Sequence, residues 1–167
     1  PITLKNLVIT RGYTTNAGGG VRASGANLAI VNSRIMASTA KDGAGIFSEG
    51  GAITITRSTI TGNTATETVG GGGMMLYPGT ATITDSTISG NFASSGGVAG
   101  NDGAGIFNLG NLDVINSTIT ANYANGSGGG IWNSGISTVN VYNSTIAVNF
   151  GNADDSNGGG AGGVYNN

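Results

Sequence analysis

The stretch STITGN at 58–63 decides the fold of this chain, because variants of it recur along the whole sequence. The other copies read LVITRG, SRIMAS, STISGN, STITAN and STIAVN, at 7–12, 33–38, 86–91, 117–122 and 144–149. Their central isoleucines are Ile9, Ile35, Ile60, Ile88, Ile119 and Ile146, and successive ones lie 26, 25, 28, 31 and 27 residues apart. A repeat of this length predicts a stacked architecture in which each copy forms one structural unit.

The composition excludes several classes of protein. A chain of 167 residues favours a single domain, 1–167. Only 8% of its residues are charged, the net charge is −2 and all six basic residues precede residue 58, so no broad basic face is expected for nucleic acid. The chain has no cysteine for disulfides and no histidine to act as a general base or metal ligand. No apolar run is long enough to span a membrane.

Alternating apolar residues precede each central isoleucine. They stand seven and five positions before it, in short stretches rich in Ile, Val and Thr, which predicts β-strands. The alternation then slips by one residue, which predicts a bend or bulge at Asn6, Asn32, Arg57, Asp85, Asn116 and Asn143. No stretch has a sustained helical period. We therefore expect a parallel β-helix, in which each strand pairs with its copy one repeat later.

Polar residues recur at fixed distances from the same isoleucines. Ser33, Ser58, Ser86, Ser117 and Ser144 share a column with Leu7, which predicts that they face inward. The threonines that follow them, at 59, 87, 118 and 145, are expected to face outward. A turn column holds Asn63, Asn91, Asn122 and Asn149, and stacking would join them in a structural ladder of hydrogen bonds.

Each copy closes with Gly-x-Gly or a variant of it, followed by two larger residues. The segments are GGGVR, GAGIF, GGGMM, GAGIF, GGGIW and AGGVY, at 18–22, 43–47, 71–75, 103–107, 128–132 and 161–165. The second larger residue is Arg22, Phe47, Met75, Phe107, Trp132 or Tyr165. Because arginine is rarely buried in an apolar core, we expect this column to form an exposed contact stripe for sugar rings or another protein. Two alternatives stay open: the preceding loops cover the stripe, or the phase is reversed and the column is core.

The tetrapeptides Gly129-Gly130-Ile131-Trp132 and Gly162-Gly163-Val164-Tyr165 carry a family resemblance, with variants at 44–47 and 104–107. They resemble the repeats of bacterial surface proteins of the polymorphic outer-membrane type. The whole pattern is similar to the right-handed parallel β-helices of the pectate-lyase-like superfamily. This resemblance implies a right-handed β-solenoid. Together with the repeats, it predicts an all-β fold of about six coils of 25–31 residues, with three short strands per coil. Its members include lyases, hydrolases, adhesins and inert spacers, so the fold implies no single activity.

For a lyase, the resemblance implies clustered aspartates that bind Ca²⁺ and an Arg or Lys base on one outer face. Arg57 and Asp85 share a column in adjacent coils, which favours an ion pair between coils. Ca²⁺ needs six or more oxygen ligands. Asp42, Asp102 and the pair Asp154–Asp155 are therefore interpreted as solvated turn carboxylates, and calcium binding by them stays open. We predict no catalytic residue, no metal site and no cofactor.

The repeat pattern reaches both ends of the sequence without an evident cap. Ile2 and Leu4 are in register at one end, and Val164 and Tyr165 at the other. Joining two copies tail to head would place consecutive central isoleucines 30 residues apart, within the observed range. We therefore expect an extracellular or cell-surface structural solenoid that self-associates head to tail through these four residues, as a fibre, sheath or adhesin stalk. A second interpretation stays open, in which the chain is a segment of a larger protein, such as an adhesin, that carries the caps. The alternative is a polysaccharide-binding or polysaccharide-cleaving β-helix. The expected partners are further copies, polysaccharide or other surface proteins, without nucleic acid.

Overall fold

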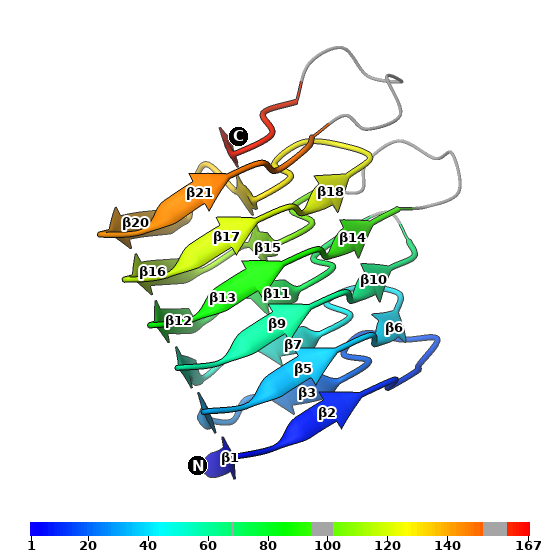
Figure 1. The fold of residues 1–167 in the computed structure, drawn as a ribbon, viewed down its shortest axis with the longest axis vertical. Helices are drawn as coiled ribbons and strands as arrows, with labels where there is room; N and C mark the ends of the chain where they lie inside the picture. Colours follow the sequence, from blue (N-terminus) through cyan, green and yellow to red (C-terminus); the bar gives the residue numbers. More distant parts are fainter. Residues whose placement is uncertain (68, 95–101, 152–159) are drawn as a thin grey trace.

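The computed structural model describes residues 1–67, 69–94, 102–151 and 160–167, and every regular element within them is a β-strand. The chain winds into a parallel β-solenoid whose coils stack along one axis (Figure 1). All strand pairings between the described elements are parallel and join each strand to its copy one repeat away, as in the register of Ile60 with Ile88. The all-β, parallel solenoid expected from the repeat is therefore confirmed. The described residues contain no helix long and apolar enough to cross a membrane.

Three six-stranded sheets form the walls of the solenoid. Sheet A consists of β1 (Ile2–Lys5), β4 (Leu28–Val31), β8 (Ala52–Thr56), β12 (Thr80–Thr84), β16 (Asn111–Ile115) and β20 (Thr138–Tyr142). Sheet B consists of β2 (Val8–Thr10), β5 (Arg34–Met36), β9 (Thr59–Thr61), β13 (Thr87–Ser89), β17 (Thr118–Thr120) and β21 (Thr145–Ala147). Sheet D consists of β3 (Val21–Ser24), β7 (Ile46–Glu49), β11 (Met74–Tyr77), β15 (Ile106–Asn108), β19 (Ile131–Asn133) and β22 (Val164–Asn166).

A fourth, shorter sheet was not expected from the sequence. Sheet C is built from the two-residue strands β6 (Thr39–Ala40), β10 (Thr64–Ala65), β14 (Phe92–Ala93) and β18 (Tyr123–Ala124). The expected number of coils also needs correction. Each long sheet has six strands, which are separated by five steps along the axis, so the chain makes about five turns rather than six.

Single residues in the left-handed backbone conformation bend each coil between its sheets. The predicted slip column lies between sheets A and B, and all six of its residues have positive φ, between 47° and 58°. Asparagine adopts this conformation more readily than most residues, which explains why it occupies four of the six positions. A second bend lies between sheets B and C, with φ between 53° and 62°. Its residues are Arg11, Ala37, Gly62, Gly90, Ala121 and Val148.

The core lies between sheets A, B and D. Ile35, Ile60, Ile88 and Ile119 are buried at its centre, which agrees with the inward phase of the central isoleucines. The column of Ser33, Ser58, Ser86 and Ser117 is also buried, as predicted. Each of these serine hydroxyls accepts the backbone N–H of the residue one coil earlier and donates to the carbonyl two residues before itself. The polar column is therefore satisfied inside the core.

The second glycine of the Gly-x-Gly segments is required by close packing along the axis. A Cβ atom on Gly73 would lie 2.5 Å from the carbonyl oxygen of Gly105 and 2.9 Å from the side-chain nitrogen of Asn91. The same clash would occur at Gly45 and Gly105, each against the next glycine and the asparagine of its own coil. The glycine column therefore makes room for the asparagine ladder described below.

Candidate functional site

The described surface has a cavity at each end of the solenoid and another at the bend between sheets A and B. At the N-terminal end, a cavity of about 480 Å³ is lined by the apolar side chains of Ile2, Leu4, Ile9 and Val21, among others. In the interior coils, the equivalent positions of these residues are buried between two neighbouring coils. Here Ile2 is exposed and Leu4 is half-buried, because in the described part of the chain only the second coil packs against them. The inner surface and the outer edges of β1, β2 and β3 are therefore open in this structure.

The opposite end has a matching surface. A cavity of about 510 Å³ is lined by three valines and four polar residues, namely Val139, Val141, Val164, Asn133, Ser137, Thr138 and Asn166. Val164 is exposed and Tyr165 is half-buried. The four residues predicted as stacking edges thus lie on the two end coils, two at each end.

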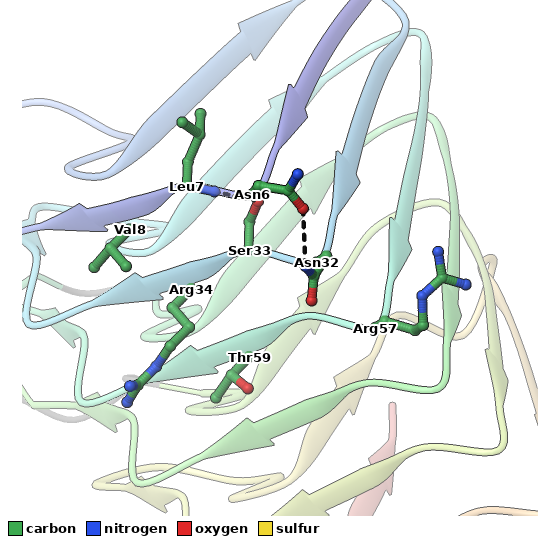
Figure 2. A pocket seen from close by; sticks show the side chains of 8 residues that line it. All are labelled: Asn6, Leu7, Val8, Asn32, Ser33, Arg34, Arg57 and Thr59. Carbon is green, nitrogen blue, oxygen red and sulfur yellow. Dashed lines mark hydrogen bonds between the residues drawn. The ribbon is translucent and has the colours of Figure 1, made fainter.

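A third cavity, of about 400 Å³, lies at the bend between sheets A and B in the first coils (Figure 2). The side-chain nitrogen of Asn32 donates to the side-chain oxygen of Asn6 over 2.8 Å, so the bend column carries an asparagine pair on its outer side. Arg34 and Arg57 flank the cavity, but their guanidinium groups point away from each other (Figure 2). They do not converge on one anionic ligand. Leu7 also lines this cavity and is exposed at the end of the solenoid.

Inside the solenoid, the four predicted ladder asparagines form a continuous chain of hydrogen bonds. The side-chain nitrogens of Asn63, Asn91 and Asn122 donate to the side-chain oxygen of the next asparagine over 3.0, 3.0 and 2.9 Å. Each of these three nitrogens also donates to the carbonyl of a central isoleucine one coil earlier. Each receiving oxygen also accepts a backbone N–H from the coil before it. The ladder ties neighbouring coils together without leaving these amide groups unpaired.

The expected exposure of the contact stripe is wrong for its central members. Phe47, Met75 and Phe107 are only 8%, 5% and 5% exposed. They do point away from the main core, but Ala17, Val69 and Leu109 pack over them and form a separate apolar cluster. Ala17 and Val69 come from loops that precede the column, as in the first alternative, whereas Leu109 follows it.

The outer members of the stripe lie at the margins of this cluster. Trp132 is half-buried and stacks on Phe107 with a ring-centroid distance of 4.3 Å, and Tyr165 is half-buried on the next strand. Arg22 is exposed, with its guanidinium 5.3 Å from the ring centre of Phe47. The column is a packing seam with two accessible ends rather than a continuous binding surface.

The sequence analysis missed an aromatic column that the structure does expose. Phe92, Tyr123 and Phe150 stack on the outer side of sheet C, with centroid distances of 5.4 and 4.7 Å and nearly parallel rings. Each stands four residues after a central isoleucine, a spacing that would have revealed the column. Because each ring covers the face of its neighbour, the edges of the rings remain available along the side of the rod.

Among the described residues, no three acidic side chains gather into a group that could hold a metal ion. The predicted ion pair of Arg57 with Asp85 is wrong: in the described part of the chain the ion pairs are Arg22–Glu49 and Lys41–Glu67. The predicted turn acids Asp154 and Asp155 lie outside the described residues.

Asp42 and Asp102 are half-buried rather than solvated, and each accepts a backbone N–H from the next coil, of Gly70 and Ser127 respectively. Burial raises the pKa of both carboxyls above the ordinary value of 3.8, and these hydrogen bonds oppose the rise. Their contacts hold one loop to the next.

The outward threonines of sheet B are half-buried at 59, 87 and 118 and exposed at 145, on the outer face as expected. A comparison of the chain with family models, with curated proteins and with solved structures finds no match in any of the three.

Proposed function

We propose that this chain is a structural β-solenoid of an extracellular or cell-surface fibre, sheath or adhesin stalk, in which solenoids stack end to end. The observation that carries the proposal is the unbroken register of the long sheets from the first coil to the last. Among the described strands, the first and last strands of sheets A, B and D each pair on one side only, and a cavity with several apolar side chains in its lining lies at each end. Open edges of this kind are templates for pairing with another chain.

The side chains at the two ends support the same arrangement. A second copy stacked in register would continue each column with a residue of similar type. The pairs brought together are Val139–Ile2, Val141–Leu4, Ile146–Ile9 and Val164–Val21. All four are contacts between aliphatic side chains, so stacking would bury the surfaces that the two cavities leave open. A head-to-tail contact of this kind repeats without closing and therefore gives a filament.

Sequence motifs, rather than the structure, suggest a family for this chain. We propose that the chain belongs with the right-handed, pectate-lyase-like β-helices, and within them with the repeats of bacterial surface proteins. The Gly-Gly-aliphatic-aromatic segments at 129–132 and 162–165 support this assignment.

Electron microscopy of the purified chain at neutral pH tests the proposal. Filaments of uniform width are expected, with an axial repeat of about 4.8 Å in fibre diffraction. The variant Leu4→Lys, which places a charge in the N-terminal apolar cavity, should abolish them. The matched control is Thr54→Lys, on the exposed outer face of the same sheet, which should leave the filaments intact. Isolated particles of one size at all concentrations would refute end-to-end stacking.

A further inference from the structure

The charges of the chain are separated along its axis. Residues 1–41 contain five basic residues and no acidic ones, whereas residues 85–167 contain five acidic residues and no basic ones. Coils stack in sequence order, so the basic residues lie in the coils at the N-terminal end (Figure 1). Among the described acidic residues, Asp85, Asp102 and Asp113 lie in coils further along the axis.

Some of the basic side chains form no ion pair with an acidic side chain in the described part of the chain. Arg22 and Lys41 pair with Glu49 and Glu67. Lys5, Arg11 and Arg34 take part in no ion pair within the described residues. The N-terminal end therefore presents a positive potential, and the acidic half of another copy is a chemically matched partner for it.

The exposed aromatic column supplies a specific contact at the same junction. Tyr13 occupies this column in the first coil, where it bridges to Thr39, and it is 74% exposed. Phe150 occupies it in the last coil, where it stacks on Tyr123 and is still 44% exposed. In a second copy stacked in register, Tyr13 is the next member of the column after Phe150. The aromatic stack would then continue from one copy into the next.

We propose that the partner at the ends is a second copy of this chain, selected and oriented by two features: the opposite charges of the two halves, and stacking of Tyr13 on Phe150. This inference rests on the proposed end-to-end stacking and adds its polarity and its recognition contact. Both features favour tail-to-head contacts and disfavour contacts between two like ends, since the latter would bring equal charges together.

Salt dependence tests the charge-based part. The screening length is about 30 Å at 0.01 M salt and about 3 Å at 1 M. Sedimentation of the whole chain should therefore show assembly that weakens on the order of tenfold or more over this range. The variant Lys5→Glu should weaken assembly at low salt and have little effect at high salt. Its control is Thr56→Glu, which adds an acid in the same column of an interior coil.

The aromatic contact is tested by exchanging rings for threonine, which occupies this column in the second and third coils as Thr39 and Thr64. Tyr13→Thr should weaken assembly about 2- to 10-fold. The control Phe92→Thr removes an exposed ring from the interior of the column and should leave assembly unchanged.

The possible failures are distinguishable. If filaments form but are insensitive to salt, and if Tyr13→Thr weakens them no more than Phe92→Thr does, this inference is overturned while end-to-end stacking stands. If the chain stays monomeric at every salt concentration, this inference and end-to-end stacking are both overturned. The edge strands would then pair with further coils of a longer polypeptide.

Discussion

The substitution Asn91→Ala probes how strongly the asparagine ladder holds one coil to the next. Asn91 is fully buried, and its side chain takes part in four hydrogen bonds. Its oxygen accepts the backbone and side-chain N–H groups of Asn63, and its nitrogen donates to Ile60 and to Asn122. Truncation to alanine removes all four bonds from the centre of the molecule.

The cost follows from the groups left behind. The side-chain nitrogen of Asn63 keeps its bond to the carbonyl of Ile35, but its backbone N–H loses the acceptor that Asn91 provides. A buried donor without a partner costs about 1–3 kcal/mol, and the void left by the amide costs about 1 kcal/mol more. We therefore expect Asn91→Ala to lower the free energy of unfolding by about 2–4 kcal/mol.

Urea unfolding followed by circular dichroism measures this change, provided that the dependence on urea concentration stays the same between variants. The matched control is Asn149→Ala at the last ladder position, where the side chain is half-buried and water can replace the lost partners. Its expected cost is about 1 kcal/mol. An Asn91→Ala variant that loses no more stability than Asn149→Ala would refute the reasoning that the buried ladder is a principal contact between coils.

Three further changes have defined outcomes. Val148→Gly should raise the free energy of unfolding by about 1 kcal/mol, measured by urea unfolding. The reason is that Val148 has a φ of 56°, is mostly exposed and shares its column with Gly62 and Gly90. The control Ala147→Gly, inside β21, should instead lower the free energy of unfolding. Ile88→Ala should lower the free energy of unfolding by about 2–5 kcal/mol in thermal or urea unfolding, since the side chain is buried at the centre of the core. A smaller loss than that caused by Thr87→Ala, on the outer face of the same strand, would contradict the buried position of Ile88. Asp42→Asn should remove part of the pH dependence of stability. Burial raises the pKa of Asp42 in the folded state, so its favourable contribution is complete below the ordinary value of 3.8 and is lost as the pH rises through the folded-state pKa. The variant keeps an oxygen to accept the Gly70 N–H, so urea unfolding should show a stability at neutral pH no lower than that of the parent.

The strands and the first bend were predictable because their sequence pattern occurs six times along the chain. An apolar position seen once is ambiguous, but the same position in six copies defines a column, and Asn6 and Asn32 mark the same left-handed residue. The second bend was harder to read because glycine, alanine, arginine and valine all occupy it. Only the backbone shows that Val148 and Gly62 have the same conformation.

The burial of the stripe was not predictable from the period. The phase correctly placed Phe47 and Phe107 on the side of their strands that faces away from the core, but burial depends on what packs over that side. The covering residues Ala17 and Val69 come from loops that vary in length and sequence between copies. Periodicity carries information about what repeats, whereas these loops do not repeat.

If copies stack end to end as proposed, the serine and asparagine ladders would not continue from one copy into the next. In the interior, a serine hydroxyl and an asparagine side chain accept backbone N–H groups from the preceding coil, as Ser144 and Asn149 do. In the first coil, those two columns hold Leu7 and Gly12, which have no side-chain oxygen to offer the last coil of another copy. A Cβ atom on Gly12 would lie within 1.9 Å of a carbonyl oxygen, so an asparagine cannot simply replace it.

A junction between stacked copies would therefore consist of strand pairing, aliphatic contacts and charge, without the side-chain hydrogen bonds that join coils inside a chain. Each missing hydrogen bond is worth about 0.5–1.5 kcal/mol, so the junction is the weakest step along such a fibre. Sedimentation in urea should then report release of chains at a lower denaturant concentration than that at which circular dichroism reports unfolding. If the two transitions coincided, the contact between copies would be as stable as the contact between interior coils. The side-chain ladders would then contribute little to the stability of the interior contacts.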